Sequence, residues 1–107
     1  MTNILLYVTC ASEEEAVKIG TALVEERLCA CANVLGRMTS IFQWEGKVQN
    51  AQEVALILKS RAGLADAVTA RVKELHSYSV PCVVALPIEG GNPAFLKWIE
   101  EETASRA

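Results

Sequence analysis

The middle of the chain, residues 29–59, constrains the fold most, because its residue patterns are typical of extended β-strands. An extended pattern runs over 29–44, with a break or bulge at Gly36–Arg37. The segment WEGKV (44–48) is typical of a hairpin tip, since its glycine accepts a tight turn. EVALILK (53–59) then forms the returning strand. The sequence therefore predicts a β-hairpin at the centre of the fold.

Strand and helix patterns flank this hairpin on both sides. The run ILLYVT is nearly unbroken in apolar residues, as expected for a buried strand. Ser12 and Glu15 form a capping box before residues that recur at helical spacing. Asn92 and Pro93 are a favourable N-cap and first-turn pair. The flanking elements predicted in this way are strand 4–9, helix 12–28, helix 64–75, strand 83–88 and a last helix that begins at 92–93.

The order β-α-β-β-α-β with an extra C-terminal helix predicts an α+β, ferredoxin-like sandwich in a single domain, residues 1–107. Two crossover helices cover one face of a four-stranded sheet. Three of the strands are apolar at successive positions, so the second face also requires burial. One short terminal helix covers little of it, and we therefore expect an oligomer.

Composition excludes several classes of function. The net charge of −3 provides no basic surface for nucleic acid. No apolar stretch is long enough to cross a bilayer, and the N-terminus lacks the features of a signal peptide. We therefore expect a cytoplasmic protein with reduced thiols and no membrane partner. Phosphate loops, nucleophile elbows and dinucleotide fingerprints are absent from the sequence, so no enzymatic activity is expected.

The segment CACANV (29–34) raises the question of metal or redox chemistry. On an extended strand, Cys29 and Cys31 lie about 6.6 Å apart along the chain, which strains a disulfide and leaves the thiols diverging. Free cysteine is also among the most buried residue types. We interpret Cys29 as a core residue. Cys31 is interpreted as structural, with a metal role if a neighbouring chain supplies a ligand.

Other candidate residues lie at the ends of the predicted elements. His76, the single histidine, follows the second helix; it is either a solvated group near the helix end or a ligand for copper or zinc. Glu53 and Lys59 fall on one face of the returning strand. These two charges either pair across a subunit cleft or are solvated at the strand ends.

Five segments together resemble one known family. They are CANV (31–34), TSIFQWEGKVQ (39–49), EVALILKS (53–60), HSYSVPCVVALPI (76–88) and FLKWI (95–99), and the chain is similar along its whole length to the CutA divalent-cation-tolerance family. The resemblance implies a compact homotrimer in which long hairpin strands pair between neighbours. It also implies binding of copper, zinc or another divalent metal, with His76, Cys31 and Cys10 as candidate ligands and no organic cofactor.

The same resemblance leaves two alternatives open. Trimers of this family are similar to PII-type signalling proteins, which bind small ligands in clefts between subunits. Trp44, Glu53, Lys59 and Tyr78 are the candidate cleft residues. The plainer alternative is a rigid trimeric scaffold that presents a partner surface.

Overall fold

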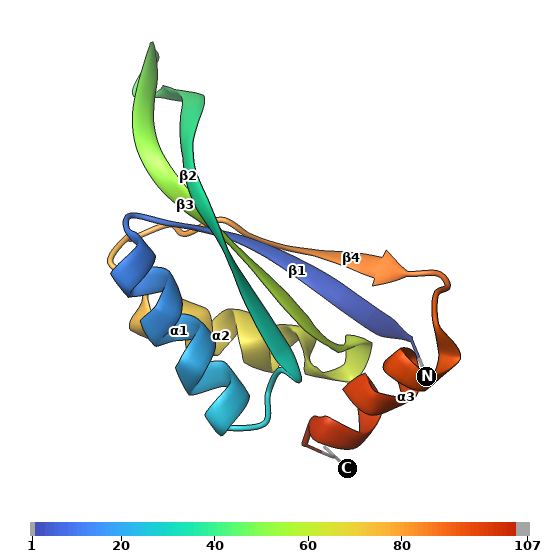
Figure 1. The fold of residues 1–107 in the computed structure, drawn as a ribbon. Coiled ribbons are helices and arrows are strands. Elements are labelled where there is room, and N and C mark those ends of the chain that lie inside the picture. Colours follow the sequence, from blue (N-terminus) through green and yellow to red (C-terminus); the bar gives the residue numbers. More distant parts are fainter. Residues whose placement is uncertain (1, 105–107) are drawn as a thin grey trace.

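The computed structural model describes residues 2–104 and contains one four-stranded antiparallel sheet with strand order β2-β3-β1-β4 (Figure 1). This order, followed by an additional helix, confirms the predicted ferredoxin-like arrangement. The elements are β1 (Asn3–Cys10), α1 (Glu13–Glu25), β2 (Cys31–Trp44), β3 (Lys47–Arg61), the 3-10 helix η1 (Ala62–Leu64), α2 (Ala65–Leu75), β4 (Val83–Ile88) and α3 (Pro93–Glu102).

The first helix is shorter than the predicted 12–28 because the chain reverses direction at Arg27. This residue has a φ of 59°, in the left-handed region that ends many helices. The amide of Leu28 then returns to the carbonyl of Leu23 at 3.0 Å. Leu28 and Cys29 enter the hydrophobic core, which confirms the interpretation of Cys29 as a core residue. Burial of these two side chains therefore determined where the helix stops.

The central hairpin is longer and more regular than predicted. Glu45 and Gly46 both have positive φ, 51° and 77°, as a two-residue turn between twisted strands requires. The returning strand is continuous over Lys47–Arg61, so the predicted 53–59 is only its inner part. The predicted irregularity at Gly36–Arg37 is confirmed as a register shift between Val34 and Arg37.

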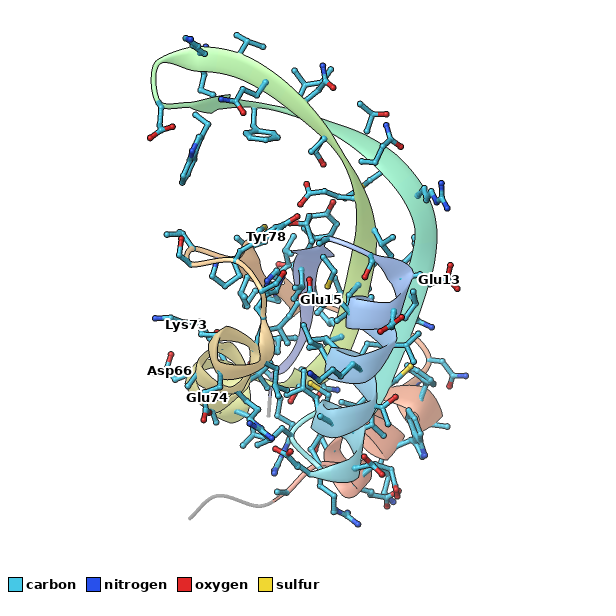
Figure 2. All side chains as sticks on the ribbon, turned by 90° about the vertical axis from the view of Figure 1, so that its left-hand side faces the viewer. Glu13, Glu15, Asp66, Lys73, Glu74 and Tyr78 are labelled. Carbon is cyan, nitrogen blue, oxygen red and sulfur yellow. The ribbon has the colours of Figure 1, made fainter. Side chains whose placement is uncertain are left out.

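The outer half of this hairpin projects beyond the sheet. Strand β1 pairs with β3 only from Val54 to Arg61, so residues 38–53 pair with each other alone. We call residues 38–53 the arm. Figure 2 shows the arm curving over the segment that carries Tyr78. The arm therefore creates a concave surface that the sheet alone does not have.

Helices α1 and α2 cover one face of the sheet and form the core with it (Figure 1). Alternate residues of β1 and β3, including Leu6, Val8, Leu56 and Leu58, are fully buried there. The approach of α1 to β2 is close, because a Cβ on Gly20 would lie 2.9 Å from that of Ala32. The two helices thus exclude solvent from this face of the sheet.

The opposite face is covered only at one end, by α3. The side-chain amide of Asn3 donates to the carbonyl of Leu96 at 3.0 Å, and Ile99 is fully buried. Val84 and Leu86 on β4 point to this face, as do their partners Tyr7 and Leu5 on β1. Val84 and Leu86 are 50% and 49% exposed. Within residues 2–104 no helix is long and apolar enough to cross a membrane.

Candidate functional site

Three ligand-type side chains meet where β1, α1 and α2 end or begin. The thiol of Cys10, the carboxylate of Glu15 and the imidazole of His76 each place one donor atom within 4.8 Å of the others. Cys10 and His76 were predicted as ligands, whereas Glu15 was expected only as a capping residue. The fold therefore assembles a sulfur, oxygen and nitrogen donor set that we call the Cys-Glu-His cluster.

Both ring nitrogens of His76 have backbone partners. Nε2 lies 2.8 Å from the carbonyl oxygen of Thr9, and Nδ1 lies 3.0 Å from the amide nitrogen of Tyr78. A carbonyl only accepts and an amide N–H only donates, so Nε2 carries the proton and Nδ1 accepts. His76 is a buried imidazole that ties the segment after α2 to β1. The predicted solvated histidine is therefore wrong, because burial against Thr9 replaces water.

The carboxylate of Glu15 joins the same two regions. One oxygen accepts the amide N–H of Ala11 and the other that of Ser77, both at 3.0 Å. Burial alone raises the pKa of Glu15, but these hydrogen bonds outweigh it and hold the pKa below its ordinary value. Glu15 is therefore ionised at neutral pH and serves as a clamp between the start of α1 and the end of α2.

The thiol of Cys10 is fully buried and close to two carboxylates. Burial, followed by the charges of Glu15 and Glu53, raises the pKa of Cys10 to about 12. The thiol is therefore protonated at neutral pH in the absence of a cation. A dication at the cluster reverses this balance, since a coordinated thiol loses its proton.

Tyr78 links the cluster to the arm. Its ring lies 4.6 Å from that of His76, and its hydroxyl donates to the carboxylate of Glu53 at 2.8 Å. Burial raises the pKa of Tyr78 to about 12, and the bond to Glu53 and the charge of that residue add to the effect. The phenol is therefore a stable donor at neutral pH.

A groove of about 650 Å³ lies between the arm and the segment 78–82. Trp44, Glu53 and Tyr78, three of the four predicted cleft residues, line it. We call it the arm groove. The neighbouring lining residues are small or neutral, such as Ser40 and Gln49. Its volume is within the range of pockets that bind small molecules.

Lys59, the fourth predicted cleft residue, lies elsewhere. It shares a face of β3 with Glu53, as predicted, but sits six residues along the strand, roughly 20 Å away. Its ammonium group donates to the side-chain oxygen of Asn33 at 2.7 Å, contacts the sulfur of Cys31 at 3.8 Å and lies 5.7 Å from the ring centre of Phe95. Glu53 and Lys59 are therefore not neighbours within one chain, and a pairing between them across a subunit cleft stays a prediction.

Cys31 is also distant from the Cys-Glu-His cluster. Cys31 pairs with Lys59 on β3, whereas Cys10 pairs with Val54. These two partners are five residues apart, so the two cysteines lie about 16 Å apart along the direction of β3. They also point to opposite faces of the sheet. A metal role for Cys31 together with His76 requires a second chain and stays a prediction.

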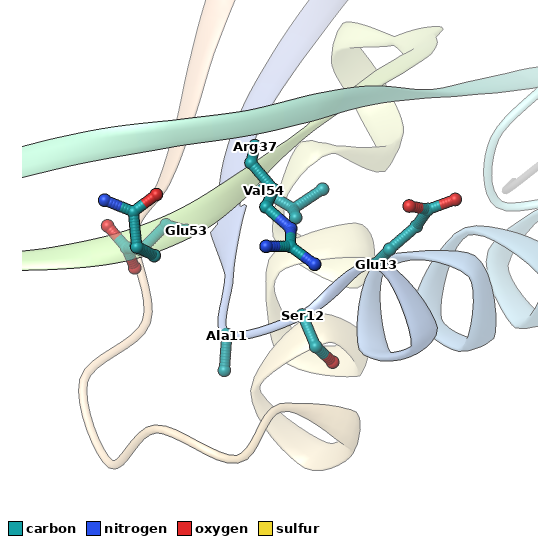
Figure 3. A pocket seen from close by; sticks show the side chains of 7 residues that line it. Ala11, Ser12, Glu13, Arg37, Glu53 and Val54 are labelled. Carbon is teal, nitrogen blue, oxygen red and sulfur yellow. The ribbon is translucent and has the colours of Figure 1, made fainter.

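A smaller hollow of about 220 Å³ lies between the base of the arm and the start of α1 (Figure 3). Arg37 and Glu13 line it, and both side chains are exposed. The hydroxyl of Ser12 accepts the amide N–H of Glu15 at 3.1 Å, so the helix start is capped by its own chain. We assign no ligand to this hollow.

Comparison with known proteins identifies the family. Residues 4–102 match the family described as CutA1 divalent ion tolerance protein. The chain belongs to this family. A Thermus thermophilus relative, named divalent-cation tolerance protein CutA, is 46% identical over 99 residues, which are 92% of this chain and 96% of that protein. The resemblance inferred from the sequence is thereby confirmed.

Rice provides a further relative and a solved structure of the same family. The protein named CutA 1, chloroplastic is 43% identical over 101 residues, which are 94% of this chain. This chain thus spans only 57% of that relative. The crystal structure of CutA1 from Oryza sativa matches with a TM-score of 0.96 at 40% identity, over 99% of this chain and 97% of that one. The fold is therefore that of CutA1 proteins.

Proposed function

We propose that this chain takes up a divalent or soft transition-metal cation at the Cys-Glu-His cluster. One observation carries the proposal: donor atoms of Cys10, Glu15 and His76, from three separate elements, lie within 4.8 Å of one another. Membership of a divalent-ion tolerance family supports it. Metal ions are thus the expected ligand of this chain.

The chemistry of the donors favours zinc or copper. Thiolate and imidazole groups suit these borderline and soft metals, whereas calcium and magnesium prefer oxygen ligands. Donors bound to one tetrahedral zinc ion lie about 3.3–3.6 Å apart, given bond lengths of about 2.0–2.3 Å. The cluster therefore needs to contract by roughly 1 Å, which side-chain rotation can supply.

Uptake also requires that the cluster opens. In the structure Nδ1 of His76 accepts the Tyr78 amide, and the Cys10 thiol keeps its proton. A cation therefore competes with a hydrogen bond and with a proton. This competition predicts binding that strengthens with pH, because the proton of Cys10 is released on coordination.

The test is a competition titration of Cu(I) and Zn(II) into fully reduced protein. We expect a defined stoichiometry per chain and at least a tenfold loss of affinity in His76→Ala and in Cys10→Ser. Cys31→Ser is the matched control, because that thiol lies about 16 Å along β3 from the cluster. Equal binding by all four proteins refutes the site. A loss in Cys31→Ser as well moves the ligand set to a site between chains.

We further propose that the chain assembles as a homotrimer through its arm and uncovered sheet face. The outer edges of both arm strands are unpaired, and free edges of this length readily pair with another chain. Ile41 and Val48 on the arm are 74% and 68% exposed, and Val84 and Leu86 are half-exposed on the sheet. Apolar surface of this extent favours association.

Light scattering on purified protein tests the assembly. The expected mass is three times the 11.6 kDa of one chain. Leu86→Glu places a charge on the uncovered sheet face and should lower the mass, whereas Glu89→Gln, just beyond β4, should not. A monomer at all concentrations, or an unchanged mass in Leu86→Glu, contradicts the proposal.

The compartment and the absence of enzymatic activity stay predictions. A cytoplasmic location is proposed from composition, although the rice relative has chloroplastic in its name. Signalling through a small ligand and a scaffold role are the alternatives to cation handling; neither has a specific contact in its favour beyond the arm groove.

A further inference from the structure

Nδ1 of His76 lies next to the carboxylate of Glu15. The distance from Nδ1 to Oε1 is 3.8 Å, close to the separation of two ligands on one ion. The other ring nitrogen, Nε2, is held by the carbonyl oxygen of Thr9 at 2.8 Å. A carbonyl bond of this kind fixes the tautomer and the orientation of a metal-binding histidine. Nδ1 is therefore the nitrogen that His76 offers to a cation.

The amide of Tyr78 already uses this nitrogen. Its N–H donates to Nδ1, and the two nitrogens are 3.0 Å apart. A zinc–imidazole bond is about 2.0–2.1 Å long and lies along the same lone pair, since a ring nitrogen has only one. The ion and the amide hydrogen therefore compete for one position. Uptake at Nδ1 requires the backbone of Tyr78 to move away from His76.

The tyrosine side is the one that can yield. Thr9 lies in β1, where pairing with Ala55 on β3 holds its backbone in the sheet. Residues 77–80, which include Tyr78, form a bend between α2 and β4 that belongs to neither a helix nor a strand. Coordination through Nε2 instead breaks the bond to Thr9 and requires the ring proton to change nitrogen. Release of the Tyr78 amide is therefore the easier route.

The residues before Tyr78 have separate partners, so this movement is local. The His76 amide donates to the Val72 carbonyl at 2.9 Å and closes the last turn of α2. The Ser77 amide donates to Oε2 of Glu15, whereas the oxygen that lies 3.8 Å from Nδ1 is Oε1. Neither bond uses Nδ1. Release of the Tyr78 amide therefore leaves the end of α2 intact.

Tyr78 is held in place at two further points. Its ring packs against that of His76, with the ring centres 4.6 Å apart. Its hydroxyl donates to the carboxylate of Glu53 at 2.8 Å, and hydrogen bonds to carboxylates are among the stronger ones. This bond anchors the side chain to β3, 25 residues away along the chain. Moving the backbone of Tyr78 therefore disturbs both contacts.

We propose that Tyr78 gates the Cys-Glu-His cluster: its amide occupies the coordination position of His76, and its hydroxyl bond to Glu53 sets how readily that position is vacated. This role rests on the proposed uptake of a cation at the cluster. Tyr78 is a positioning residue, since it touches His76 rather than the cation. Loading of the cluster and the bond between Tyr78 and Glu53 weaken each other by the same factor.

Nuclear magnetic resonance of the single histidine identifies the coordinating nitrogen. The protein is fully reduced and labelled with nitrogen-15, and the chain has no second imidazole to overlap with His76. On saturation with zinc, we expect the Nδ1 signal to shift while Nε2 keeps its proton. Amide exchange in the same sample should accelerate about tenfold or more at Tyr78. The His76 amide, bonded to Val72, is the internal reference and should stay protected.

Tyr78→Phe tests the hydroxyl bond without changing a charge. The variant loses the bond to Glu53 and keeps the ring and the amide. We expect it to bind zinc about three- to tenfold more tightly than the wild type, because uptake no longer disturbs that bond. Tyr7→Phe is the matched control. It removes a phenol hydroxyl that lies 3.6 Å from the sulfur of Met38, and should bind zinc like the wild type.

The outcomes separate this role from metal uptake itself. If zinc binding needs His76 and Cys10 but shifts Nε2 in place of Nδ1, the gate is wrong and the cluster stays a metal site. Equal or weaker affinity in Tyr78→Phe, or unchanged exchange of the Tyr78 amide, has the same meaning. Absence of zinc binding in the wild type overturns the proposed function and the gate together. The resonance measurements use the wild type, so they decide the matter even if Tyr78→Phe fails to fold.

Discussion

Glu15→Gln tests whether the carboxylate clamp holds the site together. Glu15 accepts two backbone N–H groups, one from Ala11 and one from Ser77, each at 3.0 Å. A hydrogen bond to a charged group contributes about 1.5–3 kcal/mol. The amide keeps one accepting oxygen but turns its NH2 toward the other N–H, so one bond is lost and two donors face each other. We expect a loss of about 2 kcal/mol in the free energy of unfolding at pH 7.

The effect should depend on pH with a defined sign. The folded state holds the pKa of Glu15 below its ordinary value of 4.5, so the ionised clamp contributes its full stability above pH 4.5. This contribution is lost as the pH falls through the lowered pKa of the folded state. The wild-type carboxylate is then protonated and uncharged, like the amide in Glu15→Gln. The difference between wild type and Glu15→Gln should therefore shrink in acid.

Urea unfolding at one fixed protein concentration measures this difference, because the stability of an oligomer depends on concentration. Glu13→Gln is the control: it removes the same charge from the first turn of α1, where Glu13 is exposed. Hydrogen exchange at the Ser77 amide reports the clamp locally and should accelerate only in Glu15→Gln. Equal stability of the two variants at pH 7, or a gap that persists at low pH, refutes the reasoning.

Three further predictions concern the core. Leu56→Ala removes a fully buried side chain and should cost about 2–5 kcal/mol of unfolding free energy, measured in urea; a loss below 1 kcal/mol contradicts the described packing. Gly20→Val should lower the melting temperature, because even a Cβ there lies 2.9 Å from that of Ala32; an unchanged melting curve shows that α1 can move away. Cys10 and Cys29, both with pKa raised to about 12 by burial, should react with a thiol reagent at pH 8 only after unfolding, and rapid labelling of either contradicts their burial.

Much of the fold was predictable because its signals are local. The capping box at Ser12 is confirmed, since its hydroxyl accepts the amide of Glu15. The turn at Gly46 and the irregularity near Arg37 were also visible as residue patterns. The end of α1 was missed because an arginine in the left-handed region carries no sequence signal, and burial of the next residues decided it.

The site was only half predictable. Cys10 and His76 were named as ligands, but nothing local indicated that Glu15 would reach the Ser77 amide, 62 residues away. The capping box identified Glu15 as a first-turn residue and was the available signal. Three of the four predicted cleft residues line the arm groove, whereas Lys59 shares a face of β3 with Glu53 but lies six residues away along it. A cleft that a second chain completes stays a prediction.

By itself, the sequence determined the order of strands and helices, the hairpin and the apolar second face, because periodicity and turn chemistry act over a few residues. The tertiary structure alone decided which side chains meet. Crossover connections bring the ends of β1 and α2 together at Cys10 and His76, and the arm brings Trp44 into the same groove as Tyr78. These contacts depend on strand register and packing between distant segments, and such long-range terms leave no pattern in neighbouring residues.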